Sequence, residues 1–342
     1  MYPATHRAMR DVAVVSFSSY ATAGGELDET EMLVRVIGDA LARAGIPKSD
    51  IGFTVSGSSD YLGGRPFSFV MALDAVGAWP PISESHVEMD GAFALYEAWV
   101  RLQHGDIDTA LVYAFGRATQ GSLRDVLAVQ LDPYCVAPLW PDETSLAALQ
   151  ARALLDSGRC TERDFAAVVA RGSSSSVDEL LARPYEVAPL RAHDRVPFMD
   201  GASAVVLAAG DRARRACERP AWIRGIDHRI EAHSLGARDL TRSPSTELAA
   251  RRAGAHGRKV DVAEIHANYA HQELIVRDAL SLPSEVRVNP SGSKQDPFMV
   301  TGLNRIGEAS RSISEGQARS AIAHASSGPC LQQNLVCLLE AS

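Results

Sequence analysis

The chain has 342 residues, of which 46% are apolar, and its formal net charge is -8. This length is enough to bury a large hydrophobic core, as one domain or as two domains of about 150–200 residues each. The negative charge argues against nucleic acid or an anionic membrane as the main partner, because both attract basic proteins.

The cysteine pattern and the N-terminus predict the compartment. The five cysteines show neither the CxxC spacing of a metal site nor the density of a disulfide framework: Cys135, Cys160, Cys217, Cys330 and Cys337. Such a chain is typical of a reduced, cytoplasmic protein. The N-terminus lacks the apolar core of a signal peptide, and no run of about 18 apolar residues is present to span a membrane. We expect a cytoplasmic protein with no membrane partner and no metal of its own.

Strands and helices alternate along the first part of the chain. Apolar runs predict strands over 11–17, 51–57, 108–115 and 202–209. Helical patterns lie over 28–44, 91–104, 144–157 and 161–171. The first helix stops at Gly45-Ile46-Pro47, since glycine and proline end helices. The serine run after Gly172 predicts a surface loop.

The second part repeats a similar order. Strands are predicted over 221–226, 260–266, 286–290, 320–326 and 334–340, and helices over 243–254, 271–281 and 301–317. The helix at 243 begins with a capping pattern, Ser243-Pro244-Ser245-Thr246. The alternation predicts an α/β protein with layered helices and sheets. The similar order suggests an internal duplication, although no repeat is visible residue by residue.

Residues 84–95, ESHVEMDGAFAL, end a short β-like run and open a helix. Enzymes often place a nucleophile at such a turn, but here the turn holds Glu88 and Asp90 and neither cysteine nor serine. The turn therefore has either changed its chemistry or lost it.

Five segments, in order along nearly the whole chain, resemble the thiolase superfamily, most closely its sterol-carrier-protein-X, lipid-transfer-type branch. They are VEMDGAFALYEAWVRLQHGDIDTALVYAFG (87–116), APLRAHDRVPFMDGASAVVLA (188–208), VAEIHANYAHQELIVRDAL (262–280), VNPSG (288–292) with TGL (301–303), and HASSGPCLQQNLVCLL (324–339). Each fragment alone is weak evidence, but the five together at family-like spacing predict the fold.

The resemblance implies an α/β thiolase fold, with two similar βαβαβαββ halves in a five-layered αβαβα arrangement. The first half would cover residues 1–216, including a loop region at about 117–165, and the second half would cover 217–342. The resemblance also implies a homodimer that packs through the first halves. Coenzyme A would enter past the loop region as part of an acyl-CoA substrate, and no other cofactor is expected in this chain.

Two departures from the family pattern bear on the chemistry. Glu88 aligns with the nucleophilic cysteine, and Asp296 aligns with the histidine of the family's GHP motif, in a segment about three residues shorter whose second glycine is Ser293. A carboxylate cannot form a useful acyl-enzyme with a thioester, because the mixed anhydride lies uphill. Cys330 lies in the closing loop and is interpreted as a packing residue. The sequence therefore argues against thiolytic cleavage and Claisen condensation.

Polar groups remain at the aligned site. His266 takes the first position of the branch's HDxF motif, Ala267 replaces its aspartate, and Tyr269 stands where phenylalanine is usual. His324 aligns near the family's last active-site position. The catalytic candidates are thus His266, Tyr269, Asp296, Glu88 and His324.

Each candidate has a structural alternative. The histidine can be a satisfied core residue, and the tyrosine can serve packing. Asp296 can be a turn residue before proline. Glu88 can be a buried acid/base group with a raised pKa or one partner of an ion pair. Asp60, Asp90 and Asp142 are interpreted as caps or turn residues.

The resemblance favours retro-aldol cleavage, because cysteine-less members of this branch include aldolases of steroid side-chain degradation. A 3-hydroxyacyl-CoA would give a ketone or aldehyde and a shorter acyl-CoA. Such aldolases work with a small zinc-ribbon/OB-fold acyl-CoA-binding partner, so zinc is expected only in a partner subunit. Two other readings stay open: a non-catalytic acyl-CoA-binding or scaffolding subunit, and a thiolase whose cysteine is elsewhere.

Overall fold

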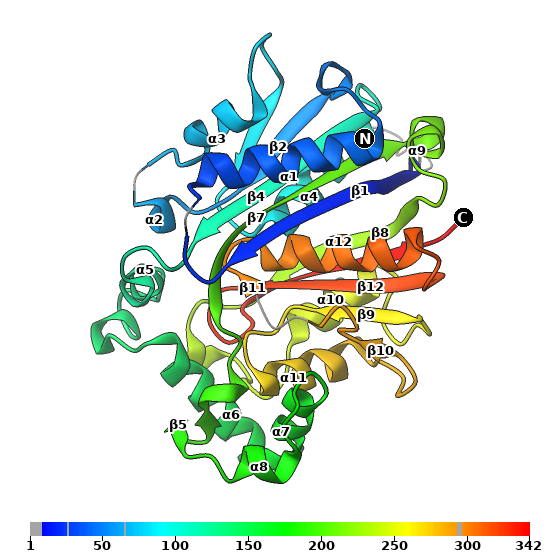
Figure 1. The fold of residues 1–342 in the computed structure, drawn as a ribbon. Helices are drawn as coiled ribbons and strands as arrows, with labels where there is room; N and C mark the ends of the chain where they lie inside the picture. Colours follow the sequence, from blue (N-terminus) through cyan, green and yellow to red (C-terminus); the bar gives the residue numbers. More distant parts are fainter. Residues whose placement is uncertain (1–8, 26, 65, 293–295) are drawn as a thin grey trace, which may run out of the picture.

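The computed structural model describes residues 9–25, 27–64, 66–292 and 296–342 (Figure 1). The first half of the fold has the order βαβαβαββ. Its elements are β1 (Val12–Thr22), α1 (Glu29–Ala44), β2 (Phe53–Gly57), α3 (Phe69–Val76), β3 (Glu84–Val87), α4 (Gly91–His104), β4 (Thr109–Arg117) and β7 (Phe198–Ala209).

The second half repeats this order. Its elements are β8 (Ala221–Ile230), α10 (Pro244–Arg252), β9 (Val262–Ile265), α11 (Ala270–Leu280), β10 (Arg287–Val288), α12 (Thr301–Ser314), β12 (Ser320–Ser327) and β13 (Gln333–Glu340). The expectation of two similar βαβαβαββ halves is therefore confirmed.

Strand pairing follows one rule in both halves. In the first half β1 and β7 are antiparallel, β7 and β4 are antiparallel, and β4, β2 and β3 are parallel. In the second half β8, β13, β12, β9 and β10 follow the same sequence of directions. The two five-stranded parts join where β1 pairs with β8 through Ala13 with Trp222 and Val14 with Ala221. The short strand β11 (Asp296–Pro297) pairs with β7 off this path.

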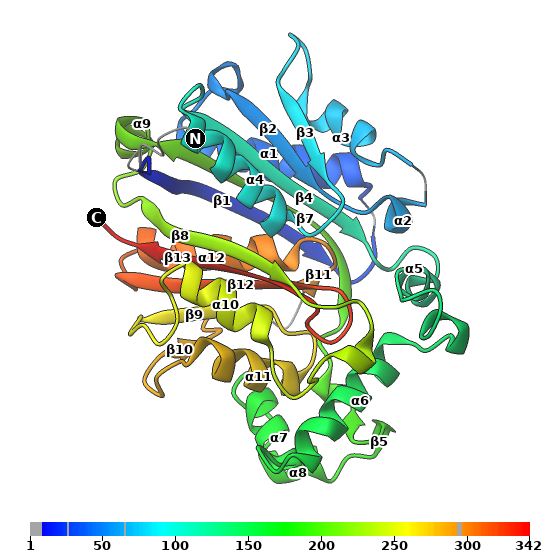
Figure 2. The same cartoon turned by 180° about the vertical axis from the view of Figure 1, so that it is seen from behind.

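Helices cover the sheets in layers. Helices α1 and α3 pack on the outer face of the first half, in a core with Leu33, Val36 and Tyr113. Helices α10 and α11 lie on the opposite side of the molecule, against the second half (Figure 2). Helices α4 and α12 contact each other and share the inner core, with Leu95 and Leu303. This is the predicted five-layered αβαβα arrangement.

Between β4 and β7 the chain forms a mostly helical extension beside the second half (Figure 1). It contains α5 (Leu123–Val129), α6 (Glu143–Asp156), α7 (Glu162–Ala170), α8 (Val177–Leu181), β5 (Tyr185–Val187) and β6 (Leu190–Arg191). Ala151 of α6 and Phe165 of α7 share a core with Ile275 and Val276 of α11. The extension is thus sequence of the first half that packs on the second. The predicted division at residues 216 and 217 stays a prediction.

The remaining elements are short. They are α2 (Asp60–Gly63), α9 (Gly210–Ala216) and the 3-10 turns Lys48–Asp50, Ala137–Leu139, Ala192–Asp194 and Leu235–Ala237. No helix in the described part of the chain is long and apolar enough to cross a membrane.

Local signals account for several helix ends. Asp28 caps α1 by accepting the N–H of Glu31, and Gly45 ends it in the left-handed conformation. Ser243 caps α10, with Pro244 as its first residue, as the sequence predicts. The serine run after Gly172 is mostly exposed, which confirms a surface loop.

Candidate functional site

A cavity of about 420 Å³ lies where the two halves and the extension meet. The first half contributes the turn before α4, with Glu88, Met89 and Asp90. The second half contributes His266, Asn268 and Tyr269 and the loops before α12 and between β12 and β13. The extension closes one side with the end of α5 and the start of α6. Its size suits a small ligand or the reacting end of a long one.

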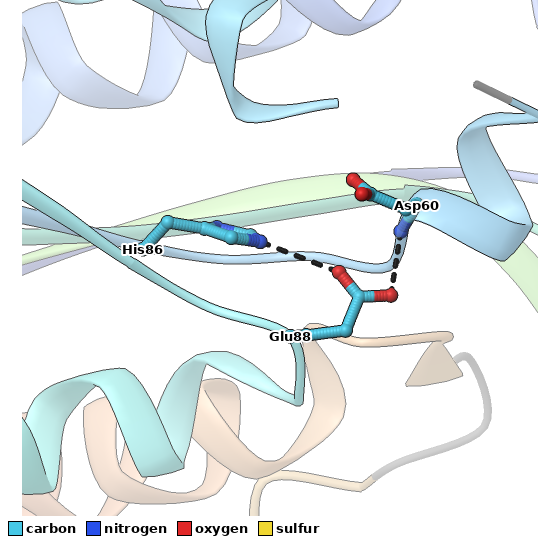
Figure 3. Close-up of side chains that lie close together, drawn as sticks. All are labelled: Asp60, His86 and Glu88. Atoms are coloured by element: carbon cyan, nitrogen blue, oxygen red, sulfur yellow. Dashed lines mark hydrogen bonds and ion pairs between the residues drawn. The ribbon is translucent and has the colours of Figure 1, made fainter. Parts of the chain in front are cut away.

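Glu88 is held at the cavity by two hydrogen bonds (Figure 3). Its Oε1 accepts the backbone N–H of Asp60 at 2.6 Å, and its Oε2 lies 3.3 Å from Nε2 of His86. The other ring nitrogen of His86 contacts Ser56 Oγ at 3.0 Å. The Glu88 side chain is 42% exposed, which argues against the first of the two alternatives, a buried acid/base group. The contact with His86 agrees with the alternative of a partnered carboxylate.

Asp60, His86 and Glu88 also form a group that offers three metal-ligand atoms within 4.8 Å of one another. Hydrogen bonds already hold these three side chains in place. Both Asp60 oxygens accept backbone N–H groups, from Phe67 and Ser68, and these bonds lower its pKa. Hydrogen bonds therefore account for the short distances within this group.

Asp90 links the two central helices. Its Oδ1 accepts the N–H of Ala92, which caps α4, and also the N–H of Leu303 in α12. Its Oδ2 accepts the N–H of Gly302 at 2.9 Å. A side chain at Gly302 would meet the Asp90 carboxylate at 2.5 Å, so glycine is needed for this approach. Asp90 is a cap, as predicted, and it caps two helices.

His266 lies at the cavity and is 7% exposed. Its Nδ1 accepts the backbone N–H of Ser326 at 3.3 Å, so Nε2 must carry the ring proton. That nitrogen lies 3.1 Å from Oδ1 of Asn268. Burial, aided by Arg305, lowers the pKa of His266 to about 3. The imidazole is therefore neutral and hydrogen-bonded at both nitrogens.

Tyr269 lines the same cavity beneath the start of α6. Its hydroxyl lies 3.1 Å from Oγ1 of Thr144, and burial raises its pKa well above the usual range. The phenol is therefore un-ionised, and its hydroxyl can donate or accept a hydrogen bond.

Glu143, the first residue of α6, is a cavity residue that the sequence reasoning did not single out. Its Oε1 accepts from Nδ2 of Asn268 at 3.3 Å. Burial raises its pKa to about 7, although Asn268, Arg195 and Tyr269 act to lower it. Acidic residues are common in the first turn of a helix, so the sequence carried no signal of this role.

Two of the predicted site residues, His324 and Asp296, are not seen to contribute a side chain to the cavity. The His324 ring is fully buried, and its Nε2 lies 2.9 Å from Oδ1 of Asn334 on the adjacent strand. Its side chain is not part of the cavity lining, so the structure does not bring His324 to the site. The backbone of Asp296 pairs with Phe198 in β11, near the cavity residues Phe298 and Met299. The side chain of Asp296 lies outside the described part.

Cys330 lines the cavity, but its surroundings disfavour a thiolate. It is 7% exposed and packs with Leu131 and Leu146, and its Sγ donates to the Leu146 carbonyl at 3.5 Å. Burial raises the pKa of its thiol to about 12. The interpretation of Cys330 as a packing residue agrees with this geometry.

Comparisons with known proteins support the fold. No established family pattern matches the chain. An acetyl-CoA acetyltransferase of Methanothermobacter thermautotrophicus is 25% identical over 158 residues, which are 39% of this chain and 41% of that protein. The chain therefore matches about two fifths of the length of this relative.

A solved structure named Ltp2-ChsH2(DUF35) aldolase superposes with a TM-score of 0.79. The match covers 97% of this chain and 98% of that one, at 16% identity. With the weak similarity to an acetyltransferase and the strand order described above, it shows that this chain has a thiolase-like fold.

Proposed function

We propose that the protein is a retro-aldol lyase that cleaves a 3-hydroxyacyl-CoA to a ketone or aldehyde and a shorter acyl-CoA, without a covalent acyl-enzyme. The observation that carries this proposal is the cavity. At the turn where thiolases hold their cysteine it holds Glu88, and opposite that turn it keeps un-ionised and acidic groups. The likeness to a structure named as an aldolase supports the same reaction class.

The reaction needs proton transfers and no nucleophile. A base takes the 3-hydroxyl proton, and the oxygen lone pair forms the carbonyl as the C2–C3 bond breaks. The bonding pair becomes a thioester enolate, which takes a proton at C2. We assign His266 and Tyr269 to the hydroxyl end of the substrate, and Glu88 or Asp296 to the return of a proton to the enolate.

The proposed substrate is a steroid side-chain CoA thioester, with coenzyme A as part of the substrate. The proposed assembly is a homodimer core with a small zinc-ribbon/OB-fold acyl-CoA-binding partner, and any zinc would belong to that partner. The solved structure that this fold matches carries two protein names, which supports the idea of a hetero-oligomer.

The test is a cleavage assay on the protein alone and co-expressed with its partner, with steroid-side-chain 3-hydroxyacyl-CoA and products followed by mass spectrometry. We expect a ketone or aldehyde and a shortened acyl-CoA. The double variant His266→Gln, Tyr269→Phe should lose about 10²–10⁴-fold in kcat/KM. The matched control His256→Gln, Tyr185→Phe, outside the cavity lining, should keep wild-type activity. Full activity in the first double variant would refute the assignment of His266 and Tyr269.

A second candidate function is a non-catalytic acyl-CoA-binding or scaffolding subunit. The observation that favours it is the full hydrogen bonding of His266, which leaves that ring no free acceptor nitrogen. Tight acyl-CoA binding without cleavage, with and without the partner and over several acyl chains, would support this candidate. Thiolase activity, which the weakly similar acetyltransferase suggests, would need a thiolate that Cys330 does not supply.

A further inference from the structure

Glu143 has one carboxylate oxygen engaged and one oxygen unused. Oε1 accepts from the amide of Asn268 at 3.3 Å. Oε2 is buried, and within the described part of the chain no donor lies in hydrogen-bonding geometry with it. The hydroxyl of Tyr269 is close enough to the carboxylate to lower the pKa of Glu143, but it does not make a well-formed bond to Oε2. The residue lines the cavity beside His266, Tyr269 and Gln272. A buried acceptor without a donor lowers the stability of the fold. A ligand that donates a hydrogen bond to Oε2 would remove this cost.

We propose that Glu143 is the base that takes the 3-hydroxyl proton of the substrate, and that Asn268 and His266 are positioning residues that hold its carboxylate. The proposal rests on the proposed function, because it assigns a group within that reaction. It replaces His266 by Glu143 as the final acceptor of the hydroxyl proton.

The hydrogen bonds run in one direction toward Glu143. Ser326 can only donate from its backbone, so Nδ1 of His266 accepts and Nε2 donates to Oδ1 of Asn268. That bond fixes the orientation of the amide, whose Nδ2 then donates to Glu143 Oε1. The Nε2–H group of His266 donates to Asn268 and its Nδ1 accepts from Ser326, so the ring has no free lone pair for the substrate. Glu143 is the last group in this series of hydrogen bonds, and its Oε2 is left to accept the substrate hydroxyl.

The charges around Glu143 leave it able to accept a proton at neutral pH. Burial is the largest influence and raises its pKa to about 7, and Asp142 acts in the same direction. Asn268, Arg195 and Tyr269 oppose this shift. Cys330 faces the same region as an uncharged thiol. A base with a pKa near the working pH is largely deprotonated and still binds a proton well.

The step balances without any co-reactant. The hydroxyl proton moves to Oε2 of Glu143, the C3–O bond becomes a carbonyl, and the C2–C3 pair passes to the thioester as an enolate. C2 then takes a proton, as described above, and Glu143 releases its proton to solvent after the ketone or aldehyde departs. The sum is one substrate converted to two products.

The experiment compares Glu143→Gln and Glu143→Asp with wild type in the cleavage assay, each co-expressed with the partner. Glutamine keeps the size and the bond to Asn268 but cannot take the proton, so kcat/KM should fall about 10²–10⁴-fold. Aspartate keeps the base, so it should restore part of the activity. The pH profile is the second readout. Wild-type kcat/KM should fall below about pH 7 as Glu143 becomes protonated, and this acidic limb should vanish in the glutamine variant.

The matched control is Glu29→Gln, since Glu29 is also the first residue of its helix, α1, and lies outside the cavity lining. It should keep wild-type activity and the acidic limb. If wild type cleaves the substrate and Glu143→Gln keeps the same rate and the same acidic limb, the assignment of the base to Glu143 is wrong, while the proposed function stands. Absence of cleavage in wild type would overturn the proposed function and this inference with it. If the glutamine variant does not fold, a folded Glu143→Ala variant that keeps the wild-type rate and the acidic limb would overturn the inference in the same way.

Discussion

Cys330 shows how surroundings decide the chemistry of one residue. The side chain lies at the cavity, yet burial raises its thiol pKa to about 12, so at pH 8 about one molecule in 10⁴ carries the thiolate. We expect iodoacetamide at pH 8 to alkylate the exposed Cys135 and to leave Cys330 unmodified, as measured by peptide mass spectrometry. Cys330→Ala should keep acyl-CoA cleavage. Rapid alkylation of Cys330 with parallel loss of activity would instead favour acyl transfer through a thiolate.

The double cap at Asp90 belongs to the scale of the elements, because it ties the starts of α4 and α12 to each other. Asp90→Ala would leave three buried N–H groups, of Ala92, Gly302 and Leu303, without this acceptor. We expect the free energy of unfolding to fall by about 2–4 kcal/mol, measured by urea unfolding at pH 7. The control Asp28→Ala removes an exposed cap of one helix and should cost about 1 kcal/mol. Equal losses in the two variants would show that Asp90 does not couple the helices.

At the same scale, the sequence predicted the elements whose signals are local. Helices α1, α4 and α10 begin and end within a residue or two of their predicted bounds, because their caps and apolar stripes lie in the segment itself. The strands β1, β7 and β8 run several residues further than their apolar runs. Pairing with neighbouring strands decides those ends, and pairing is a tertiary property.

The site was predicted in part, for the same reason. The family-like segments placed Glu88, His266 and Tyr269, and the structure brings all three to one cavity. The contact of Asn268 with Glu143 joins residues 125 positions apart, and no pattern within either segment signals it. The side chain of His324 hydrogen-bonds Asn334 on the adjacent strand and does not line the cavity, so its catalytic role stays a prediction.

For the whole molecule, buried histidines predict how stability depends on pH. His266, His271 and His324 lie inside the protein, and burial is the main cause that lowers each pKa from 6.5 to about 3. The unfolded chain therefore binds three more protons than the folded protein between about pH 6 and pH 3. The contribution of the neutral histidines to the free energy of unfolding is therefore fully present above pH 6.5 and is lost as the pH falls below it. Each histidine contributes about 1.4 kcal/mol per pH unit to the slope.

Glu143 opposes this slope, because its raised pKa makes the folded protein bind a proton between about pH 4.5 and pH 7. These four groups together contribute a net of about two protons near pH 5.5, which lowers the free energy of unfolding by about 3 kcal/mol per pH unit on acidification. Glu84, Asp194 and Glu308, whose pKa values burial also raises, reduce this slope, so we expect a smaller fall for the whole protein. Urea unfolding at several pH values measures this slope.

His271→Gln should reduce the slope by about 1.4 kcal/mol per pH unit, because it removes a histidine that must be neutral in the fold. The control His104→Gln, at an exposed position at the end of α4, should leave it unchanged. An unchanged slope in His271→Gln would mean that the His271 ring takes up a proton in the folded protein, and that its burial does not keep it neutral.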